Sequence, residues 1–343
     1  MDRASLADVP AVGAVPADGA DGDGAGDGAG DGAAGGDTVG AGNGAGNGAA
    51  GPDAEPPRRP ALSPSRAGDF KQCPLLYRFR AIDRLPEVPS RAQVRGTLVH
   101  AVLERLFDLP APRRVPSVAR ALVAPTWEEL CGEAPELLTA LFTGPDDPEL
   151  AEWLESAGTL LEAYFALEDP RRLEPEAREL LVETELASGL LLRGYLDRVD
   201  VAATGEVRIV DYKTGPAPRE MHEARALFQM KFYALALLHL RGRVPTQLRL
   251  LYLADGESLT YAAEEAELRR FERTLEAIWA AIRAAGATGD FRPNPGRGCD
   301  WCSHRARCPA WDGEPPPYPG WPADAAAIEE PPGPLAAVLE HAD

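Results

Sequence analysis

Two neighbouring segments, GYLDRVD at residues 194–200 and VRIVDYKTG at residues 207–215, decide the fold class of this chain. Each is a short run rich in β-branched and apolar residues, and the turn-forming residues 203–206 separate them. Together with LVETELAS at residues 181–188, they predict three consecutive strands that pair as antiparallel neighbours. Helical patterns before and after these strands indicate a mixed α/β fold and exclude a regular βαβ alternation.

The spacing of apolar residues predicts the remaining elements. Ser63 followed by Pro64 is an N-cap with proline at the first helical position, so a helix should begin there. Proline-rich residues 110–150 are expected to be irregular. We expect helices over 64–81, 93–109, 149–168, 174–181, 219–240 and 263–285, and a further strand over 247–255.

Composition divides the chain into three parts. Residues 1–60 contain the run GADGDGAGDGAGDGAAGG, which has almost no apolar side chain to bury and is therefore expected to be disordered. Residues 312–343 are rich in proline and acids and contain no Lys or Arg, so they are expected to form a tail or a peripheral wrap. One domain of residues 61–311 remains.

The net charge of −19 is concentrated in the two ends. The first part has ten acidic and three basic residues, the last has seven acidic residues, and the domain has 37 acidic and 32 basic residues. A nearly neutral domain permits a basic groove, but its bulk charge gives no support for tight binding of nucleic acid.

The sequence also bears on the compartment. No stretch approaches ~18 uninterrupted apolar residues and no secretory leader opens the chain, so we expect a soluble, cytoplasmic protein without a membrane partner. Five cysteines, an odd number, fit metal ligation in a reducing compartment better than a disulfide framework.

Two acids and a lysine form the first candidate site. Asp197 and Asp211 fall on adjacent predicted strands, and Lys213 shares a strand face with Asp211 because residues two apart point the same way. Two carboxylates suit Mg²⁺ or Mn²⁺, and a lysine beside them can hold a water or stabilise charge on a phosphate. By itself a D-x-K triplet is more often a solvated strand end. Arginine supplies 32 of the 35 basic residues, so lysine is not the default cation here.

Three companions strengthen this interpretation. His100 ends the motif GTLVH on a predicted helix, and Gln229 and Tyr233 lie one helical turn apart after the strands. Taken singly, each is better explained by packing. In the order G-x-x-x-H, G-x-x-D-R-x-D, D-Y-K-T and Q-x-x-x-Y, they strongly resemble the RecB-type branch of the PD-(D/E)XK nucleases over residues 63–311.

The resemblance implies a restriction-endonuclease-like core, in which helices flank a mixed central sheet, and a set of metal ligands. Asp197 and Asp211 would be the two metal-binding acids, and His100 would be an additional ligand from the helix before the sheet. Leu196 stands where the superfamily name implies proline, which is a common departure in the RecB-like branch.

The resemblance also assigns the residues around the metal. Lys213 would be the catalytic lysine, and Gln229 with Tyr233 would support the site and contact DNA. Two nearby acids are not assigned to this group. Asp200 is interpreted as a structural residue. Glu104 is a candidate for contacting the metal ligands without binding the metal itself.

The cysteines form a second constellation. Cys299, Cys302 and Cys308 lie within ten residues, and Cys73 precedes the other motifs. Thiolates select iron–sulfur clusters or zinc over hard ions. This arrangement resembles the iron–sulfur nucleases of the AddAB type and of CRISPR adaptation, which implies a [4Fe–4S] cluster that joins the N- and C-terminal parts of the domain. Cys131 matches no motif and is interpreted as a spare thiol.

Zinc is the alternative metal. His304 lies between the second and third cysteines of the triplet, so Cys299, Cys302, His304 and Cys308 would complete a local Cys₃His site. That arrangement leaves Cys73 without a role. Either metal would act structurally.

The leading hypothesis is therefore a Mg²⁺- or Mn²⁺-dependent deoxyribonuclease, acting as an exonuclease on single-stranded DNA or free ends in repair or recombination. One alternative is a non-catalytic iron–sulfur module of the same fold that docks DNA or a helicase. Another is a metal-storage or redox protein, which the order of the nuclease motifs makes a poor explanation. The sequence has no G-x-x-x-x-G-K-[ST] motif, so a separate helicase would have to supply any unwound DNA.

Overall fold

The structure is a computed structural model that describes residues 61–217 and 223–321. The disorder expected for residues 1–60 concerns positions outside this range, as does the tail after Trp321. Across the described residues, none of the helices has both the length and the apolar character that a membrane crossing demands.

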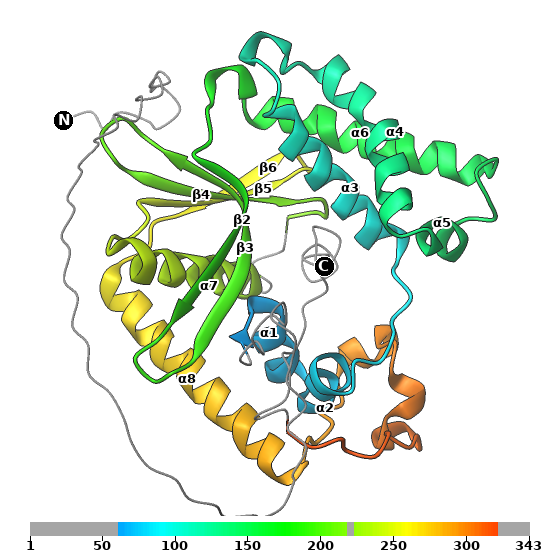
Figure 1. Ribbon diagram of the computed structural model, residues 1–343, viewed down its shortest axis with the longest axis vertical. Helices are drawn as coiled ribbons and strands as arrows, with labels where there is room; N and C mark the ends of the chain where they lie inside the picture. The colour runs from blue at the N-terminus through cyan, green and yellow to red at the C-terminus, as the bar shows by residue number, and fades with distance from the viewer. Residues whose placement is uncertain (1–60, 218–222, 322–343) are drawn as a thin grey trace, which may run out of the picture. The chain divides into compact units, whose positions relative to one another are not determined.

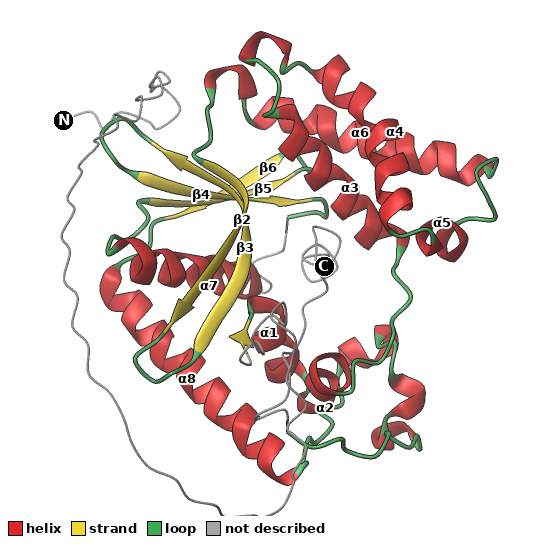
Figure 2. Ribbon diagram, in the orientation of Figure 1, coloured by secondary structure: helices red, strands yellow, loops and turns green. Residues whose placement is uncertain are grey.

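A mixed sheet forms the centre of the fold (Figures 1 and 2). Its strands follow the order β1-β3-β4-β5-β6, and β2 also pairs with β3. β3 is antiparallel to both β2 and β4, as the sequence predicts, while β4 runs parallel to β5 and β5 antiparallel to β6. The strands are β1 (Ala61–Leu62), β2 (Ala177–Glu185), β3 (Leu191–Val201), β4 (Val207–Lys213), β5 (Gln247–Tyr252) and β6 (Glu257–Tyr261).

Helices cover both faces of this sheet. The strand period of two explains how: along β4, Val207 and Ile209 pack with the core that contains α7 and α8, whereas Val210 and Tyr212 pack with the core that contains α3, α4 and α6. The helices are α1 (Pro64–Gln72), α2 (Pro74–Tyr77), α3 (Arg91–Leu106), α4 (Pro116–Glu133), α5 (Glu136–Leu141), α6 (Pro148–Leu167), α7 (Glu223–Arg241) and α8 (Glu265–Thr288).

Three expectations about these elements were wrong. Residues 110–150 are not irregular, because α4 takes Pro116 into its first turn, accommodates an internal proline, and buries Val123 and Trp127 against its neighbours. The segment 174–181 is not helical, because pairing with β3 outweighs the helical propensity of its Glu and Leu residues. The third error is an omission, because the strands β1 and β6 were not predicted.

The first predicted helix is interrupted at a cysteine. Ser63 caps α1 as expected and accepts a hydrogen bond from the Arg66 backbone N–H at 3.3 Å. Cys73 then adopts an extended conformation (φ −159°) that ends α1 and precedes α2. Cys73 is therefore both the C-cap of α1 and the N-cap of α2, and its backbone N–H still donates to the Asp69 carbonyl at 2.8 Å.

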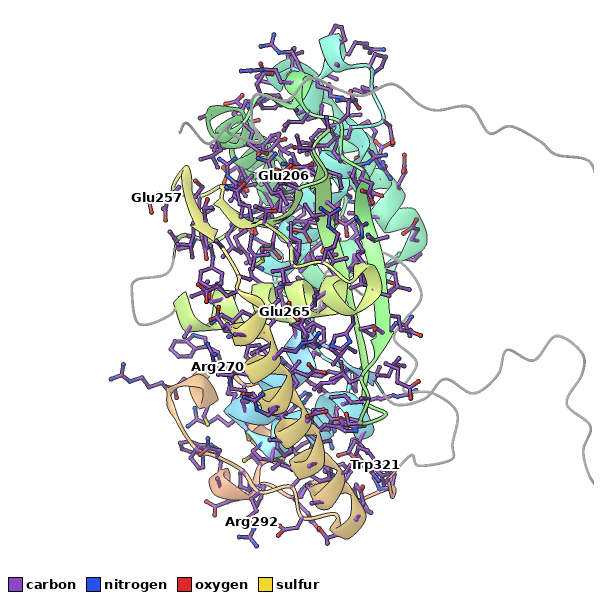
Figure 3. The ribbon with its side chains drawn as sticks, turned by 90° about the vertical axis from the view of Figure 1, so that its left-hand side faces the viewer. Glu206, Glu257, Glu265, Arg270, Arg292 and Trp321 are labelled. Carbon is purple, nitrogen blue, oxygen red and sulfur yellow. The ribbon has the colours of Figure 1, made fainter. Side chains whose placement is uncertain are left out.

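The packed chain continues beyond the point at which the tail was expected to begin. Tyr318 donates a hydrogen bond from its hydroxyl to the Gly286 carbonyl at 2.7 Å, and Trp321 packs against Trp279 with ring centroids 6.0 Å apart. Figure 3 shows Trp321 beside the C-terminal part of α8. A Cβ on Gly286 would overlap this indole, so glycine at that helical position allows the contact.

Candidate metal and catalytic site

The two predicted acids meet at the junction of β3 and β4. The paired register places Arg198 opposite Val210, so Asp197 and Asp211 are the next facing positions. Asp197 Oδ2 accepts a hydrogen bond from the Tyr212 backbone N–H at 2.6 Å. Both carboxylates are buried, with 4% and 2% of their residues' surface exposed, so the strands hold two acids out of water at one point.

His100 reaches this junction from α3. Its Nε2 lies 2.9 Å from the Tyr212 carbonyl oxygen, and its Nδ1 lies 3.6 Å from Asp197 Oδ2. In the tautomer that donates from Nε2 to the carbonyl, Nδ1 presents its lone pair to the acids. Histidines that bind metals are commonly oriented in this way by a hydrogen bond at the other ring nitrogen.

A glutamate that the sequence analysis missed completes this group. Glu179 of β2 lies opposite Asp197, between the paired positions Arg178↔Arg198 and Leu180↔Leu196. Its φ of 42° is unusual for a residue other than glycine, and such conformations often occur at functional sites. Among the described residues, the ligand atoms of His100, Glu179 and Asp197 form one group with all distances within 4.8 Å. Assigning residues 174–181 to a helix concealed this position.

The electrostatics of the group favour a cation. Burial, followed by the negative charge of Asp197, raises the pKa of Glu179 to about 9, and nearby Glu104 adds to this effect. Burial also raises the pKa of Asp197 to about 6. Carboxylates crowded in a buried site resist ionisation, and a divalent cation among them would offset their repulsion. An imidazole nitrogen and carboxylate oxygens are donors that Mn²⁺ accepts, and the carboxylates also suit Mg²⁺.

Asp211 and Lys213 lie beside this group. Lys213 Nζ lies 2.9 Å from Asp211 Oδ2 and donates a hydrogen bond to Gln229 Oε1 at 2.8 Å. Gln229 in turn donates from Nε2 to the Tyr233 hydroxyl at 3.4 Å. The structure therefore joins the four residues in one chain of polar contacts and fixes the position of the ammonium group.

The motif glycines have a tertiary role. A Cβ on Gly194 would lie 2.9 Å from the Tyr233 ring, and a Cβ on Gly96 would lie 3.3 Å from the Thr214 hydroxyl oxygen. Gly194 leaves room for α7 against β3, and Gly96 lets α3 approach the end of β4. Both glycines therefore permit the close packing that assembles the site.

Asp200 belongs to a different network. It accepts hydrogen bonds from Arg208 at 2.7 and 2.8 Å and from Arg198 at 3.0 and 3.1 Å. Arg198 has no exposed surface and also donates to Glu168 and to the Tyr212 hydroxyl. The contacts of Asp200 match the structural role expected for it.

A cavity of about 460 Å³ opens onto the site. His100, Tyr212 and Lys213 line one part of it, and the N-terminal half of α3 lines another. Trp301 and Ser303, from the cysteine-bearing segment, also contribute to its wall. A substrate in this groove would therefore contact both His100 and Lys213 of the site and the cysteine-bearing segment.

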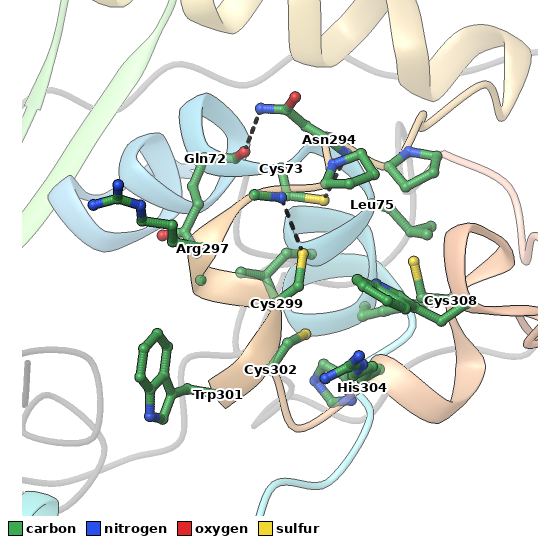
Figure 4. A pocket seen from close by; sticks show the side chains of 18 of the residues that line it. Gln72, Cys73, Leu75, Asn294, Arg297, Cys299, Trp301, Cys302, His304 and Cys308 are labelled. Carbon is green, nitrogen blue, oxygen red and sulfur yellow. Dashed lines mark hydrogen bonds between the residues drawn. The ribbon is translucent and has the colours of Figure 1, made fainter.

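The four motif cysteines line a second cavity, of about 500 Å³ (Figure 4). Cys73 comes from the break between α1 and α2, and its sulfur accepts a hydrogen bond from the Asn294 backbone N–H at 3.4 Å. Cys299 accepts one from the Gly296 backbone N–H at 3.3 Å. The structure thus brings Cys73 to the C-terminal triplet, more than two hundred residues away, while Cys131 lies in α4 and does not line this cavity.

The donor atoms of this cavity are not spaced for a single tetrahedral zinc ion. Tetrahedral zinc at about 2.3 Å from each sulfur would bring its ligand atoms to roughly 3.8 Å from one another. Among the described residues, no three of these cysteine and histidine ligand atoms lie within 4.8 Å of one another. His304 is buried, and its Nε2 lies 2.6 Å from Glu87 Oε1, so this ring already has a protein partner.

The chain is similar to known proteins over most of its described length. The profile of the PD-(D/E)XK nuclease superfamily matches residues 61–309. The Gene 69 protein of Mycobacterium phage D29 is 27% identical over 276 residues, which cover 73% of this chain and 96% of the phage protein. The Gene 69 protein of Mycobacterium phage L5 is 26% identical over 287 residues, with the same two coverages. A crystal structure of a candidate exonuclease from Eubacterium rectale has a TM-score of 0.49 and 12% identity, over 71% of this chain and 87% of that one.

Proposed function

This chain belongs to the PD-(D/E)XK nuclease superfamily, and from that premise we propose that it is a Mg²⁺- or Mn²⁺-dependent deoxyribonuclease. We propose further that it acts as an exonuclease on single-stranded DNA ends in repair or recombination. The observation that carries the proposal is the meeting of His100, Glu179 and Asp197 beside the pair formed by Asp211 and Lys213.

In this proposal the residues of the site have separate roles. His100, Glu179 and Asp197 would hold the divalent metal, and Asp211 lies beside them as the further expected ligand. When bound, the metal would polarise the scissile phosphate and neutralise its charge. Lys213, positioned by Gln229, can donate a hydrogen bond to the attacking water or to the phosphate oxygen on which charge develops. Asp197 and Asp211 are buried, so bulk water does not compete for these contacts.

The test is cleavage of end-labelled DNA by the purified full chain in Mn²⁺ or Mg²⁺. Linear single strands labelled at the 5′ or the 3′ end should be shortened progressively, whereas a circular single strand should remain intact because it has no end. Asp211→Asn serves as the inactive control. Cleavage of the circle would replace the exonuclease mode by an endonuclease mode. Binding without any cleavage would instead support a docking module, and duplex cleavage that requires an added helicase would support a separate motor partner.

We also propose that Cys73, Cys299, Cys302 and Cys308 hold a [4Fe–4S] cluster. All four line one cavity, and backbone N–H groups donate to two of the sulfurs, which is a common way of tuning clusters. Because Cys73 precedes α2 and the other three follow α8, the cluster would tie the two ends of the domain together.

The remote cysteine provides the sharpest prediction for this cluster. Protein purified without oxygen should be brown and contain about four irons per chain, and Cys73→Ser should lose both colour and iron and melt at a lower temperature. Iron analysis, the absorption spectrum and thermal unfolding measure these effects. Cys131→Ser is the matched control and should keep the cluster. A colourless wild-type protein with one zinc, which survives Cys73→Ser but loses the metal on His304→Ala, would contradict the assignment.

A further inference from the structure

A large aromatic side chain, Trp301, remains exposed beside the groove of the candidate site, as does the smaller Val88. Trp301 has 80% of its surface exposed, more than any other large hydrophobic residue in the described part of the chain. Tryptophan is usually well buried, and an indole left in water next to a cavity is a typical binding residue. Trp301 lies in the short helical turn Arg297–Trp301, between Cys299 and Cys302.

Trp301 belongs to the walls of both cavities. It lines the groove that contains His100 and Lys213, and it also lines the cavity of the cysteines. Figure 4 shows its indole pointing away from the sulfur atoms. The side chain is therefore not needed to fill the cysteine cavity, and one of its faces is available to a molecule in the groove.

The charges along the groove suit a polyanion. Its cations are Arg80, Arg95 and Lys213, and its one acid is Glu87. Glu87 is already paired, with Arg80 at 2.8 and 3.0 Å and with His304 at 2.6 Å. Although burial opposes ionisation of Glu87, the hydrogen bonds from His304 and Arg80 lower its pKa to about 2, so it remains a satisfied anion.

Arg95 has no acidic partner among the described residues. Its Nη1 donates a hydrogen bond to the Ser156 hydroxyl at 3.2 Å, and within residues 61–217 and 223–321 no carboxylate lies within ion-pair distance of it. An arginine of this kind in the same groove as Lys213 and Trp301 adds positive charge that no acid offsets, which favours contact with a phosphate backbone.

We propose that Trp301 is a stacking platform for an unpaired base of the substrate strand. This proposal rests on the proposed nuclease function and assigns its substrate class. A base inside a duplex has both faces covered by its neighbours, so an exposed indole can accept only a base that is unpaired or at an end. In this arrangement a phosphate of the strand contacts Arg95 and an unpaired base stacks on Trp301. The strand is then bound at the cysteine-bearing segment, and its end lies at Lys213.

Binding without cleavage tests the platform. In EDTA, the full chain and Trp301→Ala are titrated into fluorescein-labelled single-stranded DNA, duplex DNA and an abasic single strand, with fluorescence anisotropy as the readout. Trp301→Ala should weaken binding of the intact single strand roughly 5- to 150-fold, the range that the loss of one stacked base implies. Binding of the abasic strand and of the duplex should change much less, and Trp301→Phe should restore most of the affinity.

Trp311→Ala is the matched control. Trp311 comes from the same segment and is 43% exposed, but it stacks against Arg305 at 3.9 Å and does not line the groove. It should leave single-strand affinity nearly unchanged. Iron content and circular dichroism show whether each variant keeps its fold.

Two results would overturn the platform. One is equal affinity of the wild type and Trp301→Ala for the intact single strand. The other is an equal loss for intact and abasic strands, which would mean that Trp301 acts through the fold or through the phosphates. In either case, cleavage by the wild type would leave the nuclease assignment standing. Conversely, binding that depends on Trp301 in a protein that never cleaves would support the platform and remove the nuclease.

Discussion

Replacing Lys213 by alanine should slow metal-dependent cleavage of single-stranded DNA by about 10²–10³-fold, the loss typical of removing one donor that stabilises developing charge. The structure gives this lysine a fixed position, because Asp211 and Gln229 contact its ammonium group at 2.9 and 2.8 Å. The rate is measured in single turnover with saturating Mn²⁺ and with enzyme in saturating excess over the DNA, so that a change in DNA affinity does not enter.

The same substitution should have a secondary effect on stability. Asp211 is buried and would lose its neighbouring cation, so Lys213→Ala should melt at a lower temperature without metal and recover part of this loss in Mn²⁺. Lys231→Ala is a matched control, because Lys231 lies on α7 and pairs with Glu267 at 2.8 Å outside the site. An undiminished single-turnover rate for Lys213→Ala would remove this lysine from the mechanism.

The largest effect on folding is expected from Arg198→Met. Arg198 has no exposed surface, and its guanidinium donates to both carboxylate oxygens of Glu168 at 2.9 and 3.0 Å and to Asp200 at 3.0 and 3.1 Å. Methionine fills much of the same volume but leaves two acids short of a buried partner. Removing one member of such a network costs about 3–5 kcal/mol, so the free energy of unfolding should fall by that amount.

Urea unfolding monitored by circular dichroism measures this loss. Arg292→Met is the control, because Arg292 and Asp290 form an exposed pair, and its loss should cost less than about 1 kcal/mol. Arg198→Lys should fall between the two, since lysine keeps the charge but cannot donate to both oxygens of each acid. If Arg198→Met unfolded at the wild-type urea concentration, the buried network would contribute nothing to stability.

This network also explains how the site is held. Arg198 donates to the Tyr212 hydroxyl at 2.7 Å, while the backbone of Tyr212 contacts both Asp197 and His100. The arginine of the G-x-x-D-R motif thus lies behind the metal site and positions the strand that presents it. The strand period of two already places this arginine on the face opposite Asp197, and the tertiary structure adds that it binds Glu168 and the Tyr212 hydroxyl there.

Local pattern determined the part of the site that lies within single elements. The period of two on β4 placed Asp211 and Lys213 on one strand face, and the helical period placed Gln229 and Tyr233 one turn apart. The structure joins these two pairs through the hydrogen bond from Lys213 to Gln229, which no local pattern contains. The antiparallel pairing of β3 with β4 was also predicted, because a short turn between two strands permits little else.

Only the tertiary structure decided which residues from distant parts of the chain lie beside the site residues. Glu179 reaches the metal site because β2 pairs in register with β3, and no local pattern contains that register. Residues 110–150 form helices because α3 and α6 bury their apolar side chains, which outweighs the number of prolines.

The same holds at the cysteine-bearing end of the domain. Cys73 meets Cys299 through packing between segments more than two hundred residues apart, and Trp301 is placed at the catalytic groove in the same way. The sequence by itself therefore determined the antiparallel pairing of β3 with β4 and the spacing of the chemical groups within each element. Contacts between elements depend on which surfaces pack against each other, and this packing is determined by the fold as a whole.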